Sequence, residues 1–86
     1  MTCWRLRPGV RLIHDSVRDA GVLLHPDGVL ILNETGARVL ALCDGNTDLV
    51  TIADALSRAY DAVPLHDLRD FLDALARRRL IERAHP

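Results

Sequence analysis

The sequence lacks lysine entirely and has only three aromatic residues, Trp4, Tyr60 and Phe71, among its 86 residues. All eleven basic residues are arginine, and twelve acidic residues bring the formal net charge to -1. This balance excludes a general electrostatic attraction to nucleic acid or to an anionic membrane surface. Because rings are so scarce, the core must be built from leucine, valine, isoleucine and alanine.

Cysteines and long apolar runs are also scarce. Cys3 and Cys43 lie far apart without metal-ligand spacing, and the four histidines are equally scattered. Free thiols of this kind are typical of a reducing compartment. The N-terminus lacks the apolar core of a signal peptide, and no run approaches the roughly 18 residues that a membrane span needs. The sequence therefore predicts a cytoplasmic protein with no membrane segment, metal or other cofactor.

The N-terminal part of the chain contains three short apolar runs. They cover residues 10–14, 22–25 and 29–32. Turn-forming residues from Pro26 to Gly28 separate the second run from the third, so we expect a three-stranded antiparallel meander. Residues 1–9 are predicted to be a tail, because Pro8 and Gly9 interrupt any regular pattern.

The third run, Val29 to Leu32, is apolar at every position. Side chains alternate along a strand, so Val29 and Ile31 should face one side of the sheet, and Leu30 and Leu32 the other. A solvated face would be polar, so both faces are expected to be covered. The pattern is equally compatible with two core faces and with one core face beside a peptide-binding groove.

Three helical patterns follow the strands. Asn33 is a suitable N-cap for the first helix, and Gly45 is expected to end it in a left-handed conformation. The second and third patterns cover residues 47–60 and 65–79. The order predicts a winged-helix-like α+β domain over residues 10–82, in which a three-stranded antiparallel sheet precedes a three-helix bundle. Residues 83–86 are predicted to be a C-terminal tail.

Neither catalysis nor DNA binding is favoured by the residue pattern. His14, Asp15 and Ser16 have the residue types of a catalytic relay, but adjacent positions at a strand end project in different directions. The three arginines at residues 77–79 suggest a DNA-binding winged helix. However, three carboxylates on the solvent-facing arc of the same helix would oppose phosphates. We therefore predict no catalytic residue and no nucleic-acid partner, and keep a DNA-binding or regulatory protein-interaction domain as the alternative function.

Peptide capture by strand addition is the third candidate. An edge strand presents unpaired backbone groups, which an extended peptide can satisfy while its side chains enter an adjacent apolar groove. If the third strand is such an edge, its two apolar faces are explained. One face packs on the domain, and the other forms a groove wall against the third helix.

The order of the segments GVRL, VLLHPDGVLILNETGARVLALCDG, IADALSRAY and LRDFLDALARRRLI resembles the PqqD family of peptide chaperones in pyrroloquinoline quinone (PQQ) biosynthesis. The resemblance spans about Pro8 to Ile81. Its most specific part is the LNET junction followed by LCDG. It implies a precursor-peptide recognition element without enzyme activity or iron–sulfur ligands. It also implies two partners, the ribosomal precursor peptide PqqA and the radical S-adenosylmethionine (SAM) enzyme PqqE.

The resemblance further implies where the peptide binds. In that family the leader of the precursor adds as a strand beside the third strand, with the third helix on the other side of the cleft. The implied peptide-binding residues in this sequence are Val29, Leu30, Ile31, Leu32, Leu68, Leu72, Leu75 and Ala76, with Arg69 and Arg79 as polar contacts at the rim. Either edge of the helical stripe could face the cleft.

Overall fold

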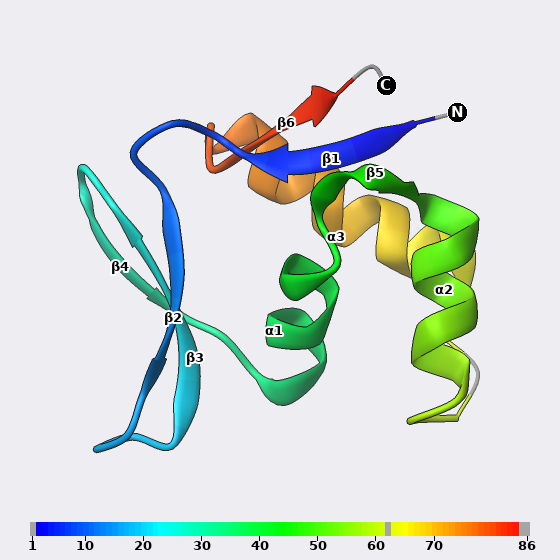
Figure 1. The fold of residues 1–86 in the computed structure, drawn as a ribbon, viewed down its shortest axis with the longest axis horizontal. Helices are drawn as coiled ribbons and strands as arrows, with labels where there is room; N and C mark the ends of the chain where they lie inside the picture. The colour runs from blue at the N-terminus through cyan, green and yellow to red at the C-terminus, as the bar shows by residue number, and fades with distance from the viewer. Residues whose placement is uncertain (1, 62, 85–86) are drawn as a thin grey trace.

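A computed structural model of the protein describes residues 2–61 and 63–84 (Figure 1). Three helices and two separate three-stranded sheets make up this part of the chain, so the fold is α+β as predicted. The elements in chain order are β1 (Cys3–Leu6), β2 (Arg11–Asp15), β3 (Ala20–His25), β4 (Gly28–Ile31), α1 (Glu34–Ala41), β5 (Asp44–Asp48), α2 (Leu49–Ser57), α3 (Leu65–Arg77) and β6 (Ile81–Ala84).

The predicted meander is the sheet formed by β2, β3 and β4, called here the wing sheet. Its strands are antiparallel and follow one another in sequence order, so β2 and β4 are its two edges. Leu12, Leu23 and Leu30 lie opposite one another in register and face the core, where Leu23 is fully buried. The wing sheet therefore packs one face on the rest of the domain.

The second sheet is built from strands far apart in the sequence, in the order β5, β1, β6. Strand β1 runs antiparallel to both neighbours, with Cys3 opposite Ala84 in β6 and opposite Asp48 in β5. An ion pair of 2.7 Å between Arg5 and Glu82 joins β1 to β6. In Figure 1 this sheet crosses above α1 and close to both termini.

The second sheet corrects the two predicted tails. Residues 3–6 are a strand, not part of a tail over residues 1–9, because Cys3 and Trp4 are buried and the partner strands supply the hydrogen bonds. Of the predicted tail over residues 83–86, Arg83 and Ala84 belong to β6, and residues 85–86 lie outside the described residues. Local sequence pattern could not predict a strand whose partners are more than 35 residues away.

The helices begin close to where the sequence predicted, but two of them end differently. The Asn33 side chain caps α1 by accepting a hydrogen bond from the Gly36 amide at 2.7 Å. The helix ends at the C-cap Leu42, and Gly45 takes its positive φ of 86° inside β5 rather than at the helix end. Likewise α2 starts after the N-cap Asp48 and is shorter than predicted.

The third helix ends in a Schellman motif, the hydrogen-bonding arrangement that closes many helices. The Leu80 amide donates to the Leu75 carbonyl, and the Arg79 amide donates to the Ala76 carbonyl. Arg79 has a φ of 60°, in the left-handed region where glycine is usual. The reversal directs Leu80 and Ile81 into the core and starts β6.

The core lies between the wing sheet, the helices and the second sheet. It is mostly leucine, isoleucine and valine, as the composition requires, with Trp4 as the buried ring. The indole of Trp4 also faces Arg83, whose guanidinium carbon lies 5.5 Å from the ring centroid. The largest fully buried side chains are Leu23, Ile52, Leu56, Leu72 and Ile81.

Candidate peptide-binding site

Strand β4 has a free edge in the wing sheet. The Leu32 amide, just after β4, donates to the Gly21 carbonyl of β3 at 2.9 Å. This bond shows which residues of β4 direct their backbone groups towards β3. Because successive residues of an antiparallel strand direct their amides to opposite sides, Leu30 bonds to β3 as well. Val29 and Ile31 therefore present their N–H and C=O groups at the free edge.

The side chains of β4 separate into an open and a closed face. Val29 and Ile31 are 57% and 54% exposed, whereas Leu30 is half-buried and Leu32 is only 7% exposed. The alternation is as predicted. However, the rest of the domain covers only the face that carries Leu30 and Leu32, although both faces were expected to be covered. Val29 and Ile31 form an exposed apolar pair on the outer face of the wing sheet.

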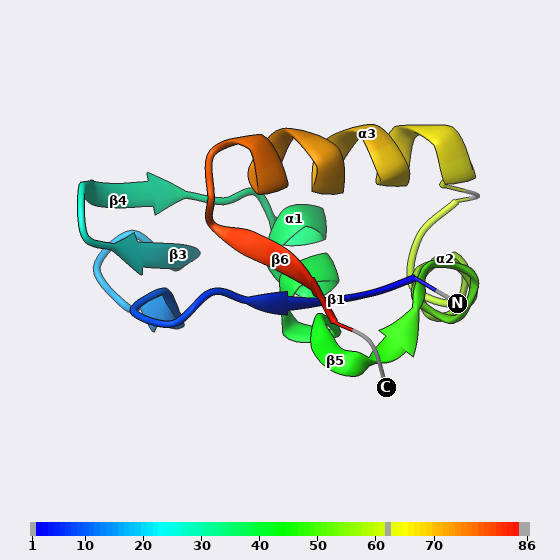
Figure 2. The ribbon, with the colours of Figure 1, turned by 90° about the horizontal axis from the view of Figure 1, so that it is seen from above.

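Helix α3 lies on the same side of the domain as β4 (Figure 2). Its ring nearest this region is Phe71, which packs on the start of α1, directly after β4. A Cβ atom added to Gly36 would lie 3.3 Å from the Phe71 ring and 2.9 Å from the Asn33 side-chain oxygen. Gly36 thus permits the close approach of α1 and α3.

An apolar hollow of about 180 Å³ opens between these two helices. Its walls are mostly aliphatic or aromatic, with Asn33, Thr35 and Asp67 as polar members. Such a hollow accommodates one apolar side chain but is far smaller than the usual site for a small-molecule ligand. The apolar lining residues are Gly36, Val39, Val63, Leu68 and Phe71.

Several helix residues that the resemblance implied for the site belong to the core. Leu68, Leu72 and Leu75 are between 0% and 4% exposed, and Leu32 of the strand is buried with them. Leu32, Leu72 and Leu75 therefore contact the core, whereas Leu68 also lines the hollow beside Phe71. The resemblance implied them for the cleft, and the apolar stripe of a helix does not show which of its members the domain itself covers.

Three further residues that the resemblance implied for the site lie on other parts of α3 or just beyond its end. Arg69 lines a hollow with Trp4 and Arg83, and Ala76 lines another with Ile81 and Glu82, so both are on the edge of α3 that faces the second sheet. Arg79 is exposed at the end of the helix. The edge facing α1 instead carries Asp67 and Phe71, which the resemblance did not imply for the site.

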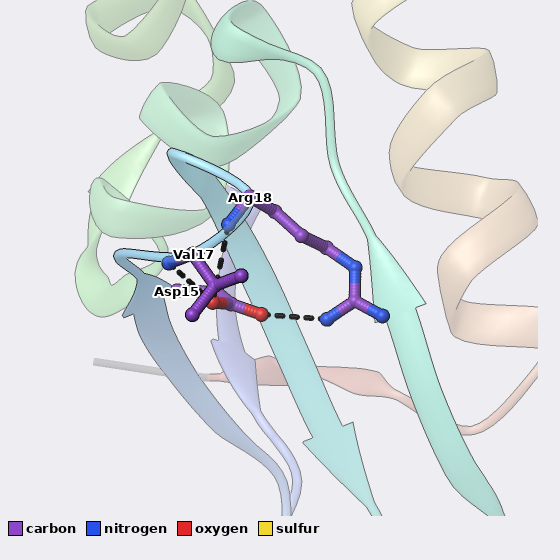
Figure 3. Close-up of polar contacts among 3 residues, drawn as sticks. All are labelled: Asp15, Val17 and Arg18. Atoms are coloured by element: carbon purple, nitrogen blue, oxygen red, sulfur yellow. Dashed lines mark hydrogen bonds and ion pairs between the residues drawn. The ribbon is translucent and has the colours of Figure 1, made fainter.

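Charged groups surround the wing sheet without forming a catalytic cluster. In the turn after β2, Asp15 accepts hydrogen bonds from the Arg18 guanidinium at 2.7 Å and from the Val17 amide at 2.9 Å (Figure 3). The Arg18 side chain is the main cause that lowers the pKa of Asp15. Asp15 is therefore a structural residue of the turn.

Cys43 has the opposite shift, because burial raises the pKa of its thiol to about 12. A thiol that stays protonated at neutral pH is a poor nucleophile. The described residues contain no group of three or more side chains that could hold a metal ion. None of the helices described here has the length and apolar character needed to cross a membrane.

Comparison with known proteins identifies the family. The family model for coenzyme PQQ synthesis protein D (PqqD) matches residues 20–81. The chain belongs to the PqqD family. It is 39% identical over 74 residues to a PqqA binding protein of Methylococcus capsulatus, covering 85% of this chain and 80% of that protein. It is also 40% identical to a bifunctional coenzyme PQQ synthesis protein C/D of Methylorubrum extorquens, covering 92% of this chain but only 22% of that protein.

Two solved structures share the fold with a TM-score of 0.75. One is the solution structure of the PqqD part of Methylobacterium extorquens PqqCD, a stand-alone recognition element for ribosomally synthesised and modified peptides. It is 40% identical, and the match covers 93% of this chain and 88% of that one. The other is TbiB1 in complex with the TbiA(beta) leader peptide, 33% identical, with 91% and 94% coverage.

Proposed function

We propose that this protein binds the leader of the ribosomal precursor peptide PqqA by adding it as a strand to the free edge of β4. The observation that carries the proposal is the unpaired edge at Val29 and Ile31, which combines free backbone groups with exposed apolar side chains. Strand addition satisfies those groups through the peptide backbone. The relatives named PqqA binding protein and the leader complex of TbiB1 support the same ligand class.

Side-chain recognition is proposed for both faces of the added strand. Residues of the peptide on the outer face pack beside Val29 and Ile31. On the inner face, an apolar residue enters the hollow beside Phe71. The backbone supplies affinity without regard to sequence, and these two apolar contacts distinguish one peptide from another.

The protein acts in this proposal as a carrier and not as an enzyme. It brings PqqA to the radical SAM enzyme PqqE in the cytoplasm and takes no part in the chemistry. The protonated Cys43 thiol and the scattered histidines are consistent with a carrier role. Winged-helix DNA binding is less favoured, because exposed Asp67 and Asp70 lie on the solvent side of α3.

A pair of proline substitutions tests the proposal through the backbone. Ile31→Pro removes an amide that faces the free edge of β4 and leaves the β3 ladder intact, because proline is tolerated at such positions. We expect the variant to fold and to lose at least about tenfold in PqqA affinity by isothermal titration calorimetry, which corresponds to one lost hydrogen bond of about 1.4 kcal/mol.

His14→Pro is the matched control, because the His14 amide faces the free edge of β2, at the other side of the same sheet. It should fold equally well and bind PqqA as the unmodified protein does. Equal loss of affinity in both variants, or in neither while both stay folded by circular dichroism, would rule out β4 as the docking strand.

A further inference from the structure

The edge of α3 that faces the second sheet carries positive charge that the proposed leader site does not use. Two hollows of about 470 Å³ and 500 Å³ open along this edge. They share Trp4, Asp73 and Arg83 among their walls and so form one groove, called here the arginine groove. Arg69 lines one end of it, and Arg77 lines the other.

The arginine groove and the proposed leader site lie on opposite edges of α3. Phe71 lines the hollow towards α1, whereas Arg69 lines the groove towards the second sheet. Two residues of an α-helix differ by about 200° in direction, so these side chains point about 160° apart around the helix axis. The buried Leu72 lies on the face between them. A ligand in the groove therefore leaves the edge of β4 and the hollow beside Phe71 open.

The three arginines of the groove are not neutralised by other described residues. No ion pair in that part of the chain includes Arg69, Arg77 or Arg83. The Arg83 guanidinium is held over the Trp4 indole, 5.5 Å from the ring centroid, and this contact orients it while its N–H donors stay available. The planar fork of a guanidinium binds a carboxylate through two parallel hydrogen bonds. The groove thus offers three groups suited to acidic side chains.

The carboxylates along the groove differ in how far they are already engaged. Asp48 accepts the backbone hydrogen bond that caps α2, and Glu82 forms an ion pair of 2.7 Å with Arg5. Asp73, half-buried at the centre of the groove, has no ion pair with any described residue. Both ends of the groove are therefore positive, while its centre combines the negative Asp73 with the positive Arg83.

We propose that the arginine groove is a second binding site, which takes an extended acidic segment of a partner protein. Arg69 and Arg77 are eight residues apart on α3, which is about 12 Å along the helix axis. An extended chain advances about 3.3 Å per residue, so its side chains at positions i and i+4 lie about 13 Å apart and point the same way. Two glutamates or aspartates at this spacing reach both arginines.

The centre of the groove selects the residue between the two acids. The side chain at position i+2 lies over Asp73 and Arg83. A glutamine or asparagine amide fits there, because it can donate to Asp73 and accept from Arg83. A third carboxylate, or the unbroken charge of a phosphate backbone, is opposed by Asp73, and such like-charge contacts exclude unsuitable partners. The groove therefore favours a peptide with separated acids over nucleic acid.

Synthetic peptides test the site, with NMR shifts of the amides and arginine side chains of labelled protein at low salt as the readout. The probe is the peptide Gly-Glu-Ser-Gln-Ser-Glu-Gly with both ends blocked. It should cause saturable shifts at Arg69, Arg77 and Arg83. A matched peptide with glutamine in place of both glutamates should bind about tenfold more weakly, because it loses both charge pairs.

Substitutions in the groove should change the affinity for the probe in a position-dependent way. Arg69→Gln and Arg77→Gln should each weaken it about threefold to fivefold, the range of an exposed ion pair. Arg58→Gln is the matched control, because Arg58 is an exposed arginine at the end of α2, outside the groove. Asp73→Asn should strengthen binding of a peptide with a central glutamate and leave the probe unchanged. Equal affinities in the Arg69, Arg77 and Arg58 variants would overturn the proposal.

Binding of the probe must also be independent of the leader. With PqqA peptide at saturation, the probe should still shift the groove arginines with the same affinity. Displacement by PqqA, or shifts centred on Val29 and Ile31, would assign the acidic segment to the leader site instead. A DNA duplex that binds these arginines more tightly than the probe would make the groove a nucleic-acid surface. The absence of saturable shifts at millimolar probe would show that it is not a binding site.

Discussion

The two sheets of this small domain have the same number of strands but opposite architecture. The wing sheet consists of consecutive strands joined by short turns, both its edges are open, and its outer face exposes Val29 and Ile31. The second sheet joins β1, β5 and β6 from three distant parts of the chain and carries the buried residues Cys3, Trp4 and Ile81. The second sheet therefore closes the core, whereas the wing sheet leaves backbone groups of β2 and β4 unpaired.

The largest expected difference between the two sheets is in stability. Trp4→Ala in β1 removes the buried ring and its contact with Arg83, and should lower the free energy of unfolding by about 3 to 5 kcal/mol. Val29→Ala in β4 removes an exposed side chain and should change it by no more than about 0.5 kcal/mol. Urea unfolding of both variants measures the contrast. Similar losses would show that the wing sheet carries as much of the core as the second sheet.

The next largest expected effect is on peptide affinity. It should arise on the β4 side of the domain and not at the second sheet. Phe71→Ala opens the hollow between α1 and α3 and should weaken PqqA binding by about tenfold, because a well-packed aromatic contact contributes about 1 to 2 kcal/mol at an interface. Val50→Ala is the control, because Val50 is an exposed apolar residue of α2, away from the wing sheet. If calorimetry gives equal affinities for the two variants, the peptide does not use the hollow.

A smaller gain in stability is expected at the link between α3 and the second sheet. Arg79 holds a left-handed conformation that costs a non-glycine residue roughly 1 to 2 kcal/mol. Arg79→Gly removes this cost, so we expect thermal unfolding to shift upwards, with PqqA affinity unchanged. A fall in PqqA affinity would instead show that Arg79 is a rim residue of the site, as the resemblance implied. A lower melting temperature would show that its side chain contributes more than the strain costs.

The smallest effect is on pH dependence and occurs in both sheets. Hydrogen bonds from Arg18 and Val17 lower the pKa of Asp15 in the wing sheet, and those from Thr51 lower the pKa of Asp48, the N-cap of α2. Their stabilisation is therefore fully present above about pH 4, the ordinary range for Asp, and is lost as the pH falls through the lower folded values.

Side-chain carboxyl titration by NMR should show both residues titrating below the ordinary value. Asp48→Asn retains a good N-cap without a titrating group, so it should abolish the part of the acid sensitivity that Asp48 contributes. An unchanged acid transition in this variant would mean that other carboxylates dominate it.

The sequence predicted the local features of the wing sheet and the helix starts well. Turn residues around Pro26, the capping residue Asn33 and the alternation from Val29 to Leu32 all depend on neighbours in sequence, and the structure confirms each of them. The second sheet could not be predicted in this way. Strand β1 exists because β5 and β6 pair with it, and those pairings follow from the overall fold.

Only part of the candidate site could be predicted, because the rest again depends on the overall fold. The strand followed from local pattern and family resemblance, and its side-chain orientation is confirmed. The helix contribution depends on how α3 is rotated against the core. Its apolar stripe contains both the buried Leu72 and the half-buried Phe71, and periodicity alone does not distinguish them. The Gly36 position in α1 was a usable signal, because a glycine inside a helix indicates close packing by a neighbour.

The central claim is that the leader adds to the free edge of β4, and the amides of the wing sheet test it most directly. In a titration of isotope-labelled protein with PqqA peptide, we expect saturable shifts at Val29 and Ile31 and slower hydrogen exchange of the same two amides. The amides of Leu12 and His14 on the opposite edge should not respond to the peptide. Saturable binding that leaves Val29 and Ile31 unchanged, or no binding at all, would contradict the account.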